Sequence, residues 1–322
     1  MQSTETLLSL YEQKFGNNNF SLNPSGLYEP VKHIMSMKGK KIRPLLLMMS
    51  SDLFGGNVEQ ALNPAFAMEL FHNFTLVHDD IMDNADIRRG IPTVHKLFGI
   101  NTGILAGDVM LAYAYKYLID IPVQTIPEVL RIFNKTAIEI FEGQQMDMDF
   151  EKREDVSETE YLKMIEYKTS VLLACSLQIG ALLAGANNAN QKKIYDFGIN
   201  LGLAFQIKDD YLDTFGESEK VGKRIGGDIL QNKKTYLLIS ALHKAKGKQL
   251  NELRALLQHE NEEEKIAGVK NLFNALGVKV DTEKRMDELY ATARESLQSV
   301  DVKAEQKARL LKLAQDVHRR DF

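Results

Sequence analysis

The sequence predicts an all-α protein, and two observations carry that prediction. Its 322 residues include only seven prolines, the residue that fits least well inside a helix. Apolar residues recur at intervals of three and four along nearly the whole chain, which is the period of an amphipathic helix. Hydrophobic residues make up 44% of the chain, which is enough for a large core.

The first strongly patterned helix is expected at residues 66–83, "FAMELFHNFTLVHDDIMD". Residues three and four apart share a helix face, so this segment carries two stripes. One stripe is apolar and consists of Phe66, Leu70, Phe74, Val77 and Ile81. The other begins with an apolar residue, Met68, and continues with the polar and acidic side chains of His72, Thr75, Asp79 and Asp83.

Two further helices follow. Residues 157–183 open with Ser157 and Glu160 at the spacing of a capping box and then become almost entirely apolar, as expected for a central helix packed on several sides. Residues 194–213, "IYDFGINLGLAFQIKDDYLD", repeat the first pattern, since an apolar helix again ends in aspartates.

The last part of the chain, from about residue 241 to residue 322, is charged and amphipathic and predicts peripheral helices over the core. Because no Pro/Ser-rich linker or low-complexity tract interrupts the sequence, we expect a single domain over residues 1–322.

Composition excludes several classes of protein. The net charge of −4 argues against a nucleic-acid-binding protein or one that binds anionic membranes. The single cysteine, Cys175, lies in an apolar run and cannot form an internal disulfide. The first residues, "MQSTETLLSL", lack the basic start and apolar stretch of a signal peptide, and no apolar run is long enough to cross a membrane. We therefore expect a cytoplasmic protein without stable membrane insertion.

Each of the two aspartate-rich helices ends in a D-D-x-x-D motif. Residues four apart lie about 6 Å apart along a helix, so Asp79 and Asp83 face the same space, as do Asp209 and Asp213. Like charges near a helix C-terminus repel one another and oppose the helix dipole. Carboxylates without histidine or thiolate partners suit Mg²⁺, which prefers a few carboxylates, waters and substrate phosphates.

Basic residues follow and precede the first acidic motif. Arg88 and Arg89 stand in "DIRRG", and "MKGKKIRP" supplies Lys38, Lys40, Lys41 and Arg43. Arginine binds phosphate oxygens in pairs and lysine adds a point charge, so two basic groups could hold two phosphorylated ligands.

Other phosphate and metal motifs are missing. "GESEKVGKR" has the wrong spacing for a nucleotide-binding P-loop, and no G-x-G-x-x-G turn follows a strand. Glu69 and His72 have the E-x-x-H spacing of di-iron proteins, but the motif is not repeated.

In order along nearly the whole chain, the sequence resembles the trans-polyprenyl diphosphate synthases. The motifs that carry this resemblance are "GKKIRP", "LVHDDIMDNADIRRGIPTVH", "GILAGD", "EGQQMD", "YKTS", "FQIKDDYLD", "GKRIGGD" and "NKKT". The resemblance implies the all-α isoprenoid synthase fold, in which a helical bundle surrounds a central apolar cavity. It also implies transfer of an allylic diphosphate's prenyl group to isopentenyl diphosphate, with about three Mg²⁺ ions.

By this resemblance, the metal ligands are Asp79, Asp83 and Asp209, with Asp80, Asp210 and Asp213 in support. The isopentenyl diphosphate site matches Lys40, Arg43, His72 and Arg89. Allylic diphosphate would be held by Arg88, Lys168, Thr169, Gln206, Lys223 and Lys233. Catalysis would rest on Asp79, Asp80, Asp83, Asp209 and Asp210 together with Arg88, Lys168 and Lys223.

Three positions depart from the family pattern. Lys38 replaces a glycine, Arg224 replaces a common proline, and Asn232 replaces a common glycine. None of the three removes a charged ligand, so the departures put the shape of the flanking loops in question and not the chemistry.

Chain length in this family depends on the depth of the apolar cavity. Phe74 is the fifth residue before the first motif, Thr75 the fourth, and Phe71 lies one turn further down. A bulky fifth and a small fourth residue resemble synthases of geranylgeranyl diphosphate. Farnesyl diphosphate remains an alternative, because Phe71 could raise the floor of the cavity.

Other functions are weighed against this one. A terpene cyclase shares the metal-triggered ionisation but needs no second diphosphate site. A non-catalytic partner subunit would have lost ligands, and both acidic motifs are intact here. The resemblance also implies a homodimer.

Overall fold

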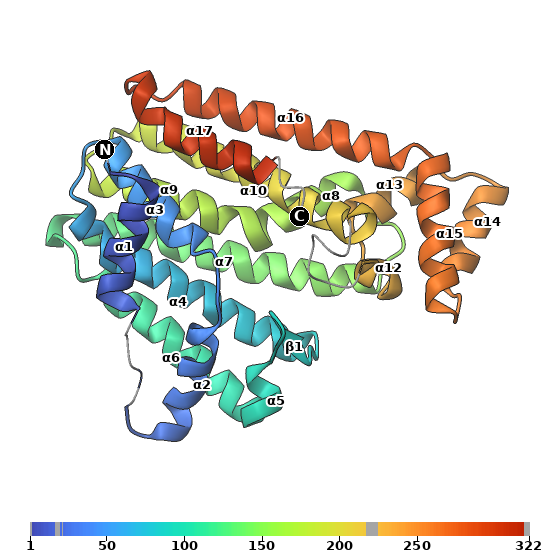
Figure 1. The fold of residues 1–322 in the computed structure, drawn as a ribbon, viewed down its shortest axis with the longest axis horizontal. Coiled ribbons are helices and arrows are strands. Elements are labelled where there is room, and N and C mark those ends of the chain that lie inside the picture. The colour runs from blue at the N-terminus through green and yellow to red at the C-terminus, as the bar shows by residue number, and fades with distance from the viewer. Residues whose placement is uncertain (1, 17–19, 21, 217–224, 319–322) are drawn as a thin grey trace. The chain divides into compact units, whose positions relative to one another are not determined.

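The computed structural model describes residues 2–16, 20, 22–216 and 225–318. These residues are helical almost throughout (Figure 1), so the all-α prediction is confirmed. The one sheet in the described part of the chain is a hairpin of two short antiparallel strands, β1 (Ile87–Arg88) and β2 (Ile91–Pro92).

The chain divides into two compact units, and each consists of two segments. The first unit comprises Met1–Asn134 and Cys175–Lys192, and the second comprises Lys135–Ala174 and Lys193–Phe322. The single-domain organisation stays a prediction.

The first unit contains α1 (Thr4–Phe15), α2 (Ser25–Ser36), α3 (Ile42–Leu53), α4 (Val58–Met82), α5 (Val94–Phe98), α6 (Ile100–Leu118) and η1 (Val123–Thr125). Three helices contribute residues to both units, namely α7 (Ile126–Glu151), α9 (Val171–Leu183) and α10 (Asn188–Phe215). The second unit contains α8 (Glu158–Ile165), the π-helical turn Glu166–Ser170, α12 (Gly227–Leu230), α13 (Tyr236–Lys244), α14 (Lys248–Leu257), α15 (Glu262–Ala275), α16 (Val278–Gln298) and α17 (Ala304–His318).

Helix α4 is the centre of the first unit and carries the helix predicted at residues 66–83. It packs against α3 and α6, and its apolar side chains are buried on several faces. Helices α9 and α3 of the same unit approach closely because residue 180 has no side chain. A Cβ at Gly180 would lie 2.1 Å from the carbonyl oxygen of Leu47. Beside it, the Ser50 hydroxyl donates to the Leu177 carbonyl at 2.6 Å.

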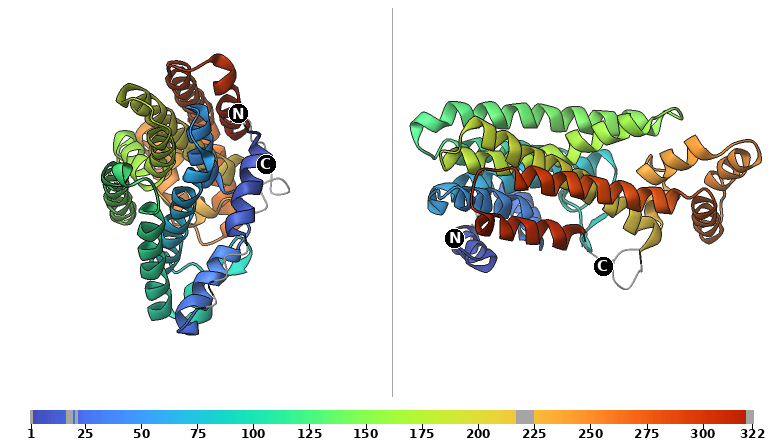
Figure 2. Two further views of the ribbon diagram at one scale, coloured as in Figure 1. Left: turned by 90° about the vertical axis from the view of Figure 1, so that its left-hand side faces the viewer. Right: turned by 90° about the horizontal axis from the view of Figure 1, so that it is seen from above.

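Two apolar clusters hold the second unit together. One joins α8, α10, α13 and α16 around Tyr161, Ile207 and Ile239, all of which are buried. The other joins α12, α13, α14 and α15 around Leu237, Leu253 and Val269. Helices α16 and α17 lie side by side (Figures 1 and 2).

The other two predicted helices are also present. The segment predicted at 157–183 forms α8, a π-helical turn and α9 in succession, with the predicted capping box of Ser157 and Glu160 at its start. The segment predicted at 194–213 lies within α10. Among the described residues, no helix combines the length and apolar character that crossing a membrane would require.

Candidate active site

The first acidic motif occupies the last turn of α4. Asp83 is the C-cap residue, and its backbone N–H donates to the Asp79 carbonyl at 2.8 Å. Asp80 points inward and is 1% exposed, whereas Asp83 is exposed. Both carboxylate oxygens of Asp80 accept hydrogen bonds from Arg88, from Nε at 2.8 and 2.9 Å and from Nη2 at 2.7 Å. The middle aspartate is therefore held by an arginine.

The hairpin that follows α4 presents this arginine. Arg88 ends β1, and the two residues that link the strands, Arg89 and Gly90, both have a positive φ, of 52° and 76°. Two-residue hairpin turns with positive φ at both positions match the twist of the strands, but a non-glycine residue is uncommon there. In this conformation Nη1 of Arg89 donates to the Lys38 carbonyl at 3.1 Å.

Lys38, where the resemblance predicts a glycine, thus contributes its backbone carbonyl to this contact. The next residue, Gly39, allows the close approach, because a Cβ there would lie 2.7 Å from Nη1 of Arg89.

His72 and Arg43 lie among the other basic residues of the first unit. Burial, followed by the charges of Arg43, Arg89, Arg88 and Lys41, lowers the pKa of His72 well below its ordinary value. The imidazole is consequently neutral near pH 7 and can donate to or accept from a ligand without adding charge.

Arg43 is half-buried, and desolvation lowers its pKa to about 10, with Glu69 opposing this shift and Arg89 adding to it. Its Nε is a buried donor without a hydrogen-bond partner among the described residues. Buried polar groups are nearly always paired, so a free guanidinium donor beside other cations fits an anionic ligand.

Two residues of this region have roles that the sequence patterns did not reveal. Lys41, grouped with the phosphate-binding candidates, instead donates to Oε1 of Glu69 at 2.9 Å. Glu69 is 4% exposed, and Oε1 also accepts from Asn73 at 3.1 Å. The signal that could have revealed it is a carboxylate placed inside an otherwise buried helix face, where a charge needs a partner. Lys40 is exposed.

The aromatic residues assigned to chain length pack closely before the first motif. Phe71 and Phe74 are 0% and 5% exposed, and their ring centroids are 5.5 Å apart. Phe71 also packs edge-on against Phe133 at 5.0 Å, and Phe74 against His78 at 4.8 Å. Thr75 is half-buried and donates to the His72 carbonyl.

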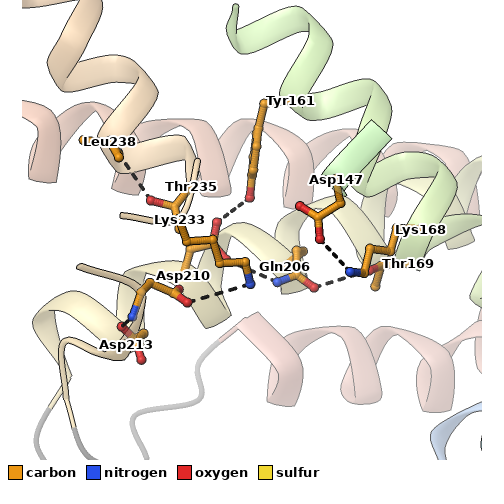
Figure 3. Close-up of polar contacts among 11 residues, drawn as sticks. Asp147, Tyr161, Lys168, Thr169, Gln206, Asp210, Asp213, Lys233, Thr235 and Leu238 are labelled. Atoms are coloured by element: carbon orange, nitrogen blue, oxygen red, sulfur yellow. Dashed lines mark hydrogen bonds and ion pairs between the residues drawn. The ribbon is translucent and has the colours of Figure 1, made fainter. Parts of the chain in front are cut away.

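The second acidic motif lies near the end of α10, and Figure 3 shows the contacts of Asp210 and Asp213. Its middle aspartate is buried like that of the first motif but has different donors. Asp210 is 3% exposed and accepts hydrogen bonds from the Tyr161 hydroxyl and from Nε2 of Gln206, the latter at 3.2 Å. Burial raises the pKa of Asp210 to about 7, against the opposing charge of Lys233. Asp209, by contrast, is exposed.

Asp213 joins the second motif to the glycine-rich turn that precedes α12. Its carbonyl accepts from the Gly226 N–H at 2.7 Å, and its Oδ2 accepts from the Asp228 N–H at 2.9 Å. After α12, Nζ of Lys233 lies 3.7 Å from Oδ1 of Asp228. Asn232, where the resemblance predicts a glycine, has a φ of 54°, and asparagine tolerates this left-handed conformation better than most residues. Lys223 and Arg224 lie outside the described residues.

Lys168 and Thr169 belong to the π-helical turn Glu166–Ser170, a conformation that is frequent at functional sites. Nζ of Lys168 lies 2.6 Å from Oδ2 of Asp147, and the Thr169 hydroxyl lies 3.4 Å from Oε1 of Gln206 (Figure 3). Gln206 therefore contacts both Thr169 and Asp210.

Glycines on two neighbouring helices make room for this turn. A Cβ at Gly143 would lie 2.4 Å from the Lys168 backbone nitrogen, and one at Gly202 would lie 2.7 Å from Cα of Ser170. Both distances are too short for a real side chain, so only glycine permits this packing.

The donor set fits Mg²⁺ in its chemistry. Each acidic motif offers exposed carboxylate oxygens and no thiolate, which is the ligand type that magnesium prefers. No group of three or more His, Cys, Asp or Glu side chains that could hold a metal ion occurs within the described parts of the chain.

Comparison with known proteins defines the class. A model of the family described as Polyprenyl synthetase matches residues 24–276. The chain is 48% identical to the geranylgeranyl diphosphate synthase of Sulfolobus acidocaldarius over 224 residues, 68% of either protein. It is 41% identical to a geranylgeranyl pyrophosphate synthase of Geoglobus acetivorans over 280 residues, 86% of either protein.

The structure is similar to a crystal structure of a geranylgeranyl pyrophosphate synthase, with a TM-score of 0.95, 42% identity and 100% of both chains covered. The protein is thus an all-α prenyltransferase with the isoprenoid synthase fold. It belongs to the polyprenyl synthetase family.

Proposed function

We propose that this prenyltransferase condenses isopentenyl diphosphate with an allylic diphosphate and that its main product is geranylgeranyl diphosphate. The observation that supports this best is the common design of the two acidic motifs. In each, the middle aspartate is buried and bound by a protein donor, Arg88 for Asp80 and Tyr161 for Asp210. Of the four outer aspartates, Asp83 and Asp209 are exposed, and Asp79 and Asp213 are half-buried. The fixed middle carboxylates would orient the outer ones toward a ligand.

We assign the metal to the outer aspartates Asp79, Asp83 and Asp209, with Asp80 and Asp213 in support. Bound Mg²⁺ would supply positive charge to the departing diphosphate. The convergence of both motifs on one diphosphate stays a prediction. A crystal structure with magnesium and an allylic diphosphate analogue would test it, and a ligand bound away from either motif would contradict it.

Several basic residues would bind the allylic diphosphate. Arg88, Lys168 and Lys233, with the predicted Lys223, would neutralise its oxygens while the carbon–oxygen bond breaks, and Thr169 and Gln206 would orient the group. The double bond of isopentenyl diphosphate would then supply the electron pair for the new carbon–carbon bond. The departing diphosphate would remove a proton from the isopentenyl unit, which restores a double bond in the product. The cation must be kept from water, which requires an apolar cavity around it.

The second substrate would be held by Lys40, Arg43, His72 and Arg89. The unpaired Nε of Arg43 and the neutral ring of His72 support this assignment, since both can donate to diphosphate oxygens. A terpene cyclase has no use for such a second site.

The experiment is a product assay. Purified protein is incubated with Mg²⁺, isopentenyl diphosphate and, in turn, dimethylallyl, geranyl and farnesyl diphosphate, and products are separated by chromatography. Geranylgeranyl diphosphate as the main product from all three starters supports the proposal, and accumulation of farnesyl diphosphate favours the alternative. Hydrocarbons formed without isopentenyl diphosphate would indicate a cyclase, and no product at all would indicate a partner subunit.

We also propose a homodimer in the cytoplasm. Exposed apolar side chains on α6, at Ile100 (56%), Ile104 (42%) and Leu105 (58%), support burial of this helix face against a second copy. Light scattering after size exclusion would test the dimer, and Leu105→Glu should yield monomers.

A further inference from the structure

Helix α15 belongs to the charged part of the chain that the sequence predicts to be peripheral. It contacts both the N-terminal and the C-terminal end of α12. Burial of α12 comes from Ile229, which is 6% exposed and packs in one cluster with Leu253, Val269 and Phe273 of α14 and α15. This apolar contact fixes one face of α12 but leaves its two ends to other interactions.

At the C-terminal end of α12, Nζ of Lys265 donates to the Leu230 carbonyl at 3.2 Å. Lys265 is 6% exposed, and burial lowers its pKa. Burying an ammonium group is unfavourable unless it is hydrogen-bonded, whereas an apolar side chain would fill the same space without that cost. The lysine is therefore suited to holding the last carbonyl of the helix, where a cation is favourable.

At the N-terminal end, Ile266 covers Gly226, the N-cap residue of the helix. Gly226 has a φ of 88°, and a Cβ on it would lie 2.8 Å from Cδ1 of Ile266. Two successive residues of α15 thus contact the two ends of α12.

The turn fixed in this way carries groups of the proposed site. Asp228 within α12 donates its N–H to Asp213, and its carbonyl accepts from the N–H of Lys233 at 3.0 Å. The Asn232 N–H donates to the Ile229 carbonyl at 3.1 Å. A shift of α12 would therefore move Lys233 relative to Asp213.

We propose that Lys265 is a positioning residue for the allylic diphosphate site: with Ile266, it locks α12 and so sets the place of Asp228 and Lys233. The inference rests on the proposed function, because it assigns Lys233 to the allylic substrate. Lys265 acts through the backbone of α12 and touches no reacting atom.

The test compares Lys265→Met, which keeps the apolar stem but removes the donor, with Lys265→Arg, which restores a cationic donor. Lys248→Met, an exposed lysine of α14, is the matched control. Steady-state KM for the allylic diphosphate and for isopentenyl diphosphate is measured at saturating Mg²⁺, and backbone amide hydrogen exchange is followed at residues 228–233.

For Lys265→Met we expect an increase of about tenfold in the KM for the allylic substrate and in exchange at residues 231–233, which corresponds to loss of one charge-assisted hydrogen bond. The KM for isopentenyl diphosphate should stay within about twofold, and Lys265→Arg should recover most of the loss. Lys248→Met should behave as the wild type.

Equal changes in both KM values, or a lower melting temperature with both KM values and the exchange unchanged, would overturn the inference. If Lys265→Met does not fold, Ile266→Ala is measured instead. The inference predicts a higher KM for the allylic substrate and faster exchange at residues 231–233, with the KM for isopentenyl diphosphate unchanged. A wild-type protein without condensation activity would refute the proposed function instead, and hydrogen exchange alone would then decide whether Lys265 holds α12.

Discussion

Arg88 and Asp80 form a two-point ion pair at the C-terminal end of α4, with Nε and Nη2 of the guanidinium 2.7–2.9 Å from the carboxylate oxygens. Asp80 is almost fully buried, so water cannot replace Arg88 as its partner. Removing one partner of a buried pair leaves an uncompensated charge, which is much more unfavourable than losing a surface contact.

We therefore expect Arg88→Ala to lower the free energy of unfolding by about 3–5 kcal/mol, as measured by urea denaturation. Lys96→Ala is the matched control, because it removes the exposed pair between Lys96 and Asp86, whose side chain is 77% exposed. That change should lower stability far less, because exposed ion pairs are screened by water. Equal effects of the two variants would contradict the view of Arg88 as the partner of Asp80.

Tyr161→Phe should weaken the second acidic motif without changing its packing. The phenyl ring keeps the buried apolar contacts, but Asp210 loses one of its two donors, which corresponds to about 1–3 kcal/mol of stability. We expect kcat to fall about tenfold because the neighbouring Asp209 is then less well oriented. Tyr290→Phe, a half-buried tyrosine of α16, should leave kcat unchanged. Wild-type kcat in Tyr161→Phe would mean that Tyr161 serves packing alone.

Gly143→Ala tests the packing of the π-helical turn. A methyl group at this position would overlap the Lys168 backbone, so the turn must shift, at a cost of about 1–3 kcal/mol. Both the melting temperature and the affinity for the allylic substrate should fall. In Gly26→Ala the new methyl group meets no atom within 4 Å, so neither quantity should decrease. A fully active and stable Gly143→Ala would show that the turn adapts freely.

Phe71→Ala combined with Phe74→Ala should lengthen the products, because it removes two buried rings before the first motif. Chromatography of the products from farnesyl diphosphate measures the change. Loss of large buried side chains also destabilises, so the assay is done well below the melting temperature. Phe66→Ala, which removes another buried ring of α4, should leave product length unaltered. If the double variant makes products of wild-type length, these rings do not form the floor.

The capping box of α8 predicts a pH dependence of stability. The backbone N–H of Ser157, followed by Arg153 and the Ser157 hydroxyl, lowers the pKa of Glu160 to about 2 from 4.5. Because the pKa is lower in the folded state, the stabilisation is present above about pH 4.5 and is lost as the pH falls toward 2.

Glu160→Gln should therefore reduce the free energy of unfolding at pH 7 relative to the wild type, and the difference between the two should shrink below pH 4.5. Urea denaturation at a series of pH values measures it. Glu154→Gln, with a side chain that is 85% exposed, serves as the control and should match the wild type throughout. A difference that does not vary with pH would rule out the carboxylate's charge as its cause.

Local spacing made the acidic motifs and their helices predictable. Asp79 and Asp83 share a face by helix geometry alone, and the capping box of Ser157 and Glu160 is a pattern of four residues. Local spacing could not predict the partner of Lys41. Glu69 lies 28 residues away and contacts Lys41 only when α3 packs on α4. The π-helical turn at Lys168 was also missed, because it depends on glycines of α7 and α10 and not on its own residues.

The sequence by itself determined that the protein is helical, where its two acidic motifs lie and which family it belongs to, because these features depend on residue types at short, fixed spacings. Only the tertiary structure decided which carboxylates are held. Asp80 is bound by Arg88 because a hairpin folds back on α4. Asp210 is bound by Tyr161, which lies 49 residues earlier in the sequence, because α8 and α10 pack together. Burial and hydrogen bonding depend on what surrounds a side chain, and those surroundings form only when the chain folds.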